Sequence, residues 1–116
     1  GFQLYQTDPS GNYSGWKATV IGQNNQAGKS ILKSDYSENN TIDQNLKIAV
    51  KILTKTMDST TPSPERIELS VLRKDEDGSL IHHTLSAAEV QVLLDEIQKE
   101  LEAEQKKAEA TTADIQ

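Results

Sequence analysis

Residues 42–57 carry a continuous apolar stripe at helical spacing, which constrains the fold more than any other feature of the sequence. Its members lie three or four positions apart: Ile42, Leu46, Ala49, Val50, Leu53 and Met57. Ile48 and Ile52 widen the stripe, so the predicted helix is buried on more than one side. Thr41 and Gln44 have the spacing of a capping box and mark its start. Such a helix needs other elements packed around it.

Strand patterns lie on both sides of this helix. Residues 2–6 and 13–21 alternate around Asp8-Pro9-Ser10-Gly11, whose proline and glycine favour a tight turn, so a β-hairpin is predicted. A second alternating pair, residues 67–71 and 80–85, predicts another hairpin with one solvated face. Both hairpins require antiparallel pairing.

Two further helices complete the predicted order. Residues 24–36 change from strand spacing to helical spacing. The proline-rich residues 58–64 end the central helix. Ser86 and Glu89 form a second capping box, which opens a helix with a narrow apolar seam. That seam consists of Val90, Leu94, Ile97 and Leu101. The order β-β-α-α-β-β-α predicts an α+β fold with antiparallel sheets.

Composition excludes several classes of partner. The formal charge is −6, from 18 acidic and 12 basic residues, so clustered cations for nucleic-acid phosphates are not expected. No apolar stretch approaches the ~20 residues that cross a membrane.

The chain has 116 residues, enough for one fold unit, but its 34% hydrophobic and 4% aromatic content is low for a self-contained globule. We therefore expect a subunit that packs against other proteins.

The C-terminal part of the sequence is acidic. Residues 89–116 hold 8 acidic residues and 3 lysines, a net charge of −5. We expect residues 1–101 to form the folded body and residues 102–116 to form a solvated, mobile helix end and tail.

No catalytic residue, cofactor or metal site is predicted. Residues 22–30 resemble a phosphate-binding loop, but five residues rather than four separate Gly22 from the Gly28-Lys29 pair. His82 and His83 are neighbours in a strand and point to opposite faces, so they cannot share one metal ion, and we expect one at the surface and one inside.

The first eighteen residues closely resemble proteasome alpha subunits. Within them the resemblance depends on Asp8-Pro9-Ser10-Gly11 and Gly15-Trp16-Lys17-Ala18. Two later segments, Leu32-Lys33-Ser34-Asp35-Tyr36 and Lys55-Thr56-Met57-Asp58, fit the helices that follow in the same family. The resemblance runs through Leu101 and implies the four-layer αββα sandwich of the N-terminal nucleophile hydrolases, of which this chain would form the C-terminal half. It would also explain why Phe2 already belongs to a strand pattern.

The resemblance implies a non-catalytic subunit of the 20S proteasome core. Its expected roles are ring assembly, substrate gating and docking of the regulatory particle in ubiquitin-dependent degradation, in the cytoplasm and nucleus. Its expected partners are other alpha-type and beta-type subunits and the regulatory particle. Active relatives use an N-terminal threonine, and Gly1 has no nucleophilic side chain.

Two further positions extend this comparison, one after the first hairpin and one at the end of the central helix. Residues 23–25 replace a serine-containing turn of active members, and Asp58 lies where those members place a supporting aspartate, although a helix-end cap is the simpler interpretation. Two alternatives stay open: an autonomous N-terminal nucleophile hydrolase, and a small acidic adaptor that acts through its C-terminal helix.

Overall fold

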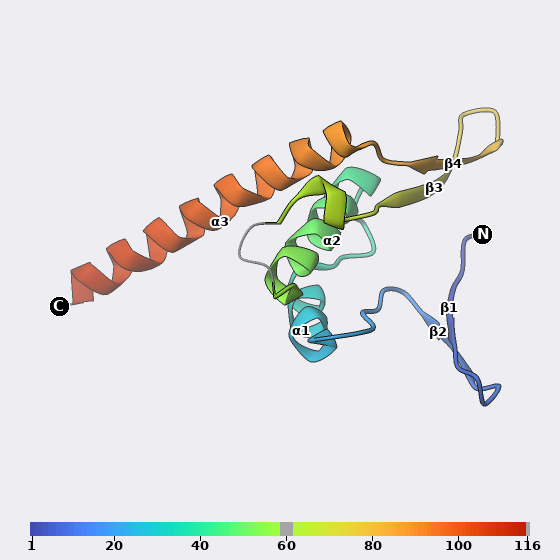
Figure 1. Ribbon diagram of the computed structural model, residues 1–116, viewed down its shortest axis with the longest axis horizontal. Helices are drawn as coiled ribbons and strands as arrows, with labels where there is room; N and C mark the ends of the chain where they lie inside the picture. The colour runs from blue at the N-terminus through green and yellow to red at the C-terminus, as the bar shows by residue number, and fades with distance from the viewer. Residues whose placement is uncertain (59–61, 116) are drawn as a thin grey trace. The chain divides into compact units, whose positions relative to one another are not determined.

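The computed structural model describes residues 1–58 and 62–115 of the chain. The chain divides into two compact units, Gly1–Asp58 and Ser59–Gln116. Figure 1 traces the elements in the predicted order, with one short 3₁₀ helix added, and both sheets are antiparallel pairs. This confirms the predicted mixed α+β class.

The first unit begins with a hairpin of β1 (Leu4–Thr7) and β2 (Tyr13–Trp16). Its register pairs Leu4 with Trp16 and Thr7 with Tyr13. The Asp8 carboxylate accepts the backbone N–H groups of Ser10 and Asn12, at 2.9 and 3.2 Å, which stabilises the predicted turn.

The second arm of this hairpin is shorter than predicted. The alternation extended to Ile21, but β2 ends at Trp16 because β1 begins at Leu4, directly opposite. The residues that follow leave the sheet, and Val20 packs beside Gly28. Val20 fits the strand alternation of the sequence but packs against α1 instead of lying in β2.

Two helices, α1 (Asn25–Asp35) and α2 (Ile42–Thr56), complete the first unit and pack against each other (Figure 1). Both helices and the capping box of α2 were predicted correctly: Gln44 N–H donates to Thr41 Oγ1 at 3.2 Å, and Thr41 N–H donates to Gln44 Oε1 at 2.8 Å. Gly28 is buried, and a Cβ atom there would lie 3.1 Å from Ile52 Cγ2. The missing side chain thus permits the close approach of the two helices.

The second unit contains the 3₁₀ helix η1 (Pro64–Arg66) and a hairpin of β3 (Ser70–Lys74) and β4 (Leu80–Thr84). The register pairs Ser70 with Thr84, so β3 starts later than the predicted Ile67. Ile67 and Leu69 are nevertheless buried. Their alternation reflects burial in an extended segment before the strand. Of the predicted helix break at 58–64, residues 59–61 lie outside the described residues.

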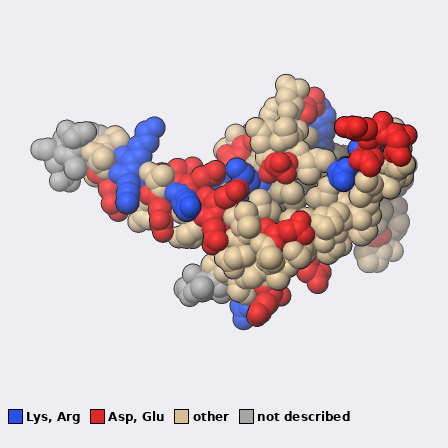
Figure 2. Space-filling model, turned by 90° about the horizontal axis from the view of Figure 1, so that it is seen from above, with Lys and Arg blue, Asp and Glu red and all other residues tan. Residues whose placement is uncertain are grey.

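The last helix, α3 (Ala87–Ile115), starts at the predicted capping box. Ser86 N–H donates to Glu89 Oε1 at 3.0 Å, and Glu89 N–H donates to Ser86 Oγ at 3.2 Å. The predicted seam is confirmed, since Val90, Leu94 and Ile97 are buried and Leu101 is half-buried. Residues 102–112 are exposed and helical, and Figure 2 shows acidic and basic side chains along this helix. Their mobility stays a prediction.

Candidate interaction surface

The hairpin of the first unit exposes large apolar side chains on both of its faces. Every residue of β1 and β2 is exposed. Tyr5 and Tyr13 lie on one face with an edge-to-face contact of 6.4 Å between ring centroids, and Tyr13 is 75% exposed. Leu4 and Trp16 lie opposite each other on the other face. Exposed aromatic groups at this density are typical of contact surfaces.

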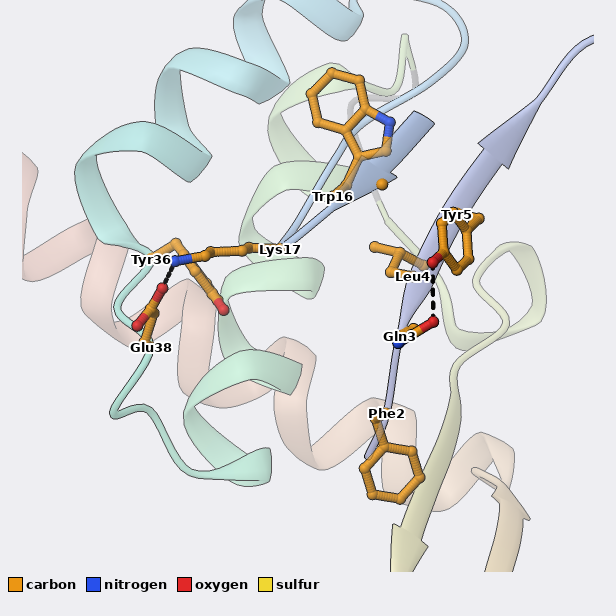
Figure 3. Close-up of a pocket in the computed structure, with 9 residues that line it drawn as sticks. Phe2, Gln3, Leu4, Tyr5, Trp16, Lys17, Tyr36 and Glu38 are labelled. Carbon is orange, nitrogen blue, oxygen red and sulfur yellow. Dashed lines mark hydrogen bonds and ion pairs between the residues drawn. The ribbon is translucent and has the colours of Figure 1, made fainter. Parts of the chain in front are cut away.

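A cleft of about 550 Å³ runs along this hairpin (Figure 3). Its walls combine aromatic and polar side chains from the hairpin and from the residues after α1, namely Phe2, Gln3, Leu4, Tyr5, Gly15, Trp16, Lys17, Tyr36 and Glu38. Tyr5 O–H donates to Gln3 Oε1 at 2.9 Å, and Lys17 forms an ion pair with Glu38. We refer to these nine residues as the hairpin cleft. Its chemistry suits a polypeptide partner better than a small polar substrate.

Side-chain amides hold the turn at residues 22–25, directly before α1. Gln23 Nε2 donates to Asp58 Oδ2 and Asn24 Nδ2 donates to the Thr56 carbonyl, each at 2.8 Å. Asn24 adopts a left-handed conformation with φ of 60°, which asparagine tolerates. These bonds join the start of α1 to the end of α2. The carboxylate of Asp58 therefore accepts a hydrogen bond from the Gln23 side-chain amide.

Sequence reasoning did not find this Gln23–Asp58 contact. The two residues are 35 positions apart, and no local pattern connects them. Only the resemblance drew attention to each position, without pairing them.

The segment that resembled a phosphate-binding loop is a helix start. Gly28 and Lys29 both lie within α1, and Gly28 N–H donates to the Asn24 carbonyl at 3.1 Å. That amide is already satisfied and buried, so it cannot cradle a phosphate. That the segment binds no nucleotide stays a prediction from its spacing.

The two histidines are both exposed, which corrects the expectation of one interior histidine. His83 stays at the surface because its ring reaches Glu89, with Nε2 at 3.1 Å from each carboxylate oxygen. No group of three or more potential metal ligands exists among the residues that the structure describes.

Hydrogen bonds to the Glu89 carboxylate lower its pKa. The main cause is the backbone N–H of Ser86, followed by the His83 side chain. The pKa of Asp8 is lowered in the same way, chiefly by the Ser10 hydroxyl. Both carboxylates hold turns together, and neither lines the hairpin cleft.

None of the described helices is long and apolar enough to cross a membrane.

Comparisons with known proteins identify relatives of this chain. The sequence profile of a family described as proteasome subunit matches residues 1–72. Proteasome subunit alpha type-4-A of Arabidopsis thaliana is 47% identical over 94 residues, which cover 81% of this chain and 38% of the relative. Proteasome subunit alpha type-4 of Dictyostelium discoideum is 44% identical over 105 residues, which cover 90% of this chain and 42% of the relative. Proteasome subunit alpha type-4 of Petunia hybrida is 54% identical over 70 residues, 60% of this chain and 28% of the relative. The chain thus spans less than half the length of these relatives.

Proposed function

The chain belongs to the proteasome subunit family as a homologue of proteasome subunit alpha type-4, and from this membership we propose that it is a structural subunit of the 20S core. It would help to build the alpha ring beside other alpha-type subunits and above beta-type subunits. Residues 1–101 would form the body, and residues 102–116 an acidic, solvated end.

The exposed hairpin surface is the observation that carries this proposal. Phe2, Tyr5 and Tyr13 are exposed although they are among the few aromatic residues of the chain. Leaving apolar side-chain surface in water is unfavourable by roughly 25 cal/mol per Å² relative to burial. Contact with a neighbouring polypeptide removes that cost, and the surface lies within the part of the chain that the family profile matches.

We further propose that the subunit is non-catalytic. The support is the turn that precedes α1, where the Gln23 side-chain amide donates to the Asp58 carboxylate at 2.8 Å. The resemblance places a serine-containing turn of active members at residues 23–25, and the amide side chains that stand there in this chain are neither nucleophiles nor bases. Proteolysis would belong to beta-type partners. The role of the subunit would lie in assembly, gating and docking of the regulatory particle, in ubiquitin-dependent degradation in cytoplasm and nucleus.

The test of membership in the core uses native particles. 20S cores purified from the organism that carries this sequence are digested with trypsin and searched for the peptide of residues 34–47. We expect the peptide to sediment with the cores in constant ratio to other alpha-type subunits. Its absence from core fractions, with presence elsewhere in the lysate, contradicts the proposal.

The contact surface is tested separately by substitution in the gene. Tyr13→Ser removes an exposed aromatic ring from the hairpin, and Val92→Ser removes an exposed apolar group from α3 as the matched control. We expect the first to reduce incorporation into cores and the second to leave it unchanged. Equal incorporation of both variants would show that the exposed ring of Tyr13 makes no contact that assembly needs.

The absence of catalysis is tested with a threonine-directed epoxyketone on the same purified cores. We expect labels on beta-type subunits and none on this chain. A covalent adduct on this chain would instead support the autonomous hydrolase.

A further inference from the structure

A second, smaller cleft on the first unit combines lysines with aromatic rings. It has a volume of about 330 Å³ and lies between the end of β2 and one side of α1. Its main lining groups are Trp16, Tyr36, Leu32 and three lysines, Lys17, Lys29 and Lys33. No acidic residue lines it. We call this the lysine cleft.

Two of its three ammonium groups have no carboxylate partner among the residues that the structure describes. Lys17 is paired with Glu38, whereas Lys29 and Lys33 take part in no ion pair there. Lys29 Nζ instead lies 5.8 Å from the centroid of the Trp16 ring. The cleft therefore presents uncompensated positive charge beside an exposed aromatic face.

The placement of these lysines is unfavourable in the isolated chain. Lys29 and Lys33 are four residues apart in α1, so their like charges face each other on one side of the helix and repel. The only acidic residue of α1, Asp35, is engaged by Lys51 at 2.9 Å. An external anion between the two ammonium groups would relieve the repulsion. Because the net charge of the chain is −6, general attraction for anions is weak, and an anion would be held by this local pair of lysines.

We propose that the lysine cleft binds an acidic peptide segment of a partner protein, with clustered carboxylates and a neighbouring apolar side chain. The carboxylates would pair with Lys29 and Lys33, and the apolar group would lie against Trp16 and Leu32. Charge complementarity and the mixed lining favour this occupant over a neutral helix or a bare phosphate. The proposal goes beyond membership in the core and does not depend on it.

The chain provides its own reporter for the test, because Trp16 is its single tryptophan. The full chain is titrated with a capped synthetic peptide of alternating glutamate and leucine, and tryptophan fluorescence is followed. A peptide with glutamine in place of glutamate is the control. We expect saturable binding of the acidic peptide that weakens as salt is added, and at least tenfold weaker binding of the glutamine peptide.

Variants locate the site. Lys29→Gln and Lys33→Gln should each weaken binding about two- to fivefold, and the double variant about tenfold, as expected for exposed charge pairs. Lys55→Gln changes the same charge on an exposed position of α2 outside the cleft and should leave the affinity unchanged. Circular dichroism verifies that each variant is folded.

Three results would overturn the proposal. One is an unchanged Trp16 signal, and another is equal weakening by Lys55→Gln, which would indicate general charge attraction. The third is binding of a single-stranded DNA oligonucleotide as tight as that of the acidic peptide, which would indicate a polyanion site without peptide selectivity.

Discussion

Lys51 donates a hydrogen bond of 2.9 Å to Asp35, which connects the middle of α2 to the last residue of α1. The side chains are 19% and 29% exposed, respectively. The exposed pair Lys17–Glu38, at 74% and 61%, provides a contrast within the same unit. Burial reduces screening by water and salt, so the two pairs should differ in their contributions to stability.

We expect Asp35→Asn to lower the free energy of unfolding by about 1 kcal/mol, because it removes the charge of the carboxylate that pairs with the half-buried Lys51 ammonium. Glu38→Gln should change it by less than about 0.5 kcal/mol. Urea unfolding followed by circular dichroism measures both. Equal losses would show that burial of the first pair has no energetic effect.

Gly28→Ala tests the contact between the two helices. Alanine favours a helix by about 1 kcal/mol, but its Cβ would lie 2.8 Å from Val20 Cγ1, and overpacking costs about 1–3 kcal/mol. We expect a net loss of about 1–2 kcal/mol. Ser30→Ala, at an exposed position of the same helix, is the control and should be neutral or slightly stabilising. A gain in stability with Gly28→Ala would mean that Val20 moves away freely.

Leu94→Ala tests the seam of α3. Leu94 is 6% exposed, so truncation should leave a cavity and cost about 2–5 kcal/mol. Val92 lies two residues away and is 56% exposed, so Val92→Ala should cost less than about 0.5 kcal/mol. The comparison uses thermal and urea unfolding. Similar losses at both positions would refute the predicted orientation of the seam.

The pKa of Glu89 predicts a loss of stability in acid. Because this pKa is lowered in the folded chain, ionised Glu89 stabilises the fold above its ordinary value of 4.5. The contribution is lost as the pH falls through the lower, folded-state pKa. Glu89→Gln keeps a capping-box residue without the charge, so the variant should show a shallower decline of melting temperature in this range. Parallel declines would show that the His83–Glu89 contact and the charged cap do not affect stability.

Deletion of residues 104–116 tests the tail. Those of them whose side chains are described, 104–112, are exposed, so the free energy of unfolding should change by less than about 0.5 kcal/mol. The same deletion in the full-length subunit, followed by purification of cores, shows whether the tail acts on an assembly partner. A large shift in the melting temperature would show that the tail packs on the body.

Helices were predicted well because their signals are local. The spacing of Thr41 and Gln44, and that of Ser86 and Glu89, encodes a reciprocal hydrogen-bond pair within one turn, and both pairs occur in the structure. Strand ends were predicted poorly because a strand ends where its partner ends. β2 ends at Trp16 because the residue paired with it, Leu4, is the first residue of β1. The alternation of apolar residues through Ile21 carries no information on that pairing.

The candidate surface was predicted only indirectly. Low aromatic content indicated a subunit, but the pattern of the hairpin could not show that Tyr5 and Tyr13 are both exposed. The contact of Gln23 with Asp58 depends on how α1 and α2 pack. The lysine cleft depends on how the chain after Trp16, the last residue of β2, passes beside α1. Such tertiary relationships have no periodic signature in the sequence.

The two-stranded form of the first sheet has a consequence for solvent exchange. In the described part of the chain, β1 and β2 pair only with each other, so each has one edge whose outward amides meet water. Those amides should take up deuterium early, while amides in the middle of α2 should exchange late. A polypeptide laid along either strand would slow exchange at every second residue of that strand alone. The pattern of slowed residues would therefore identify which edge a neighbouring subunit covers.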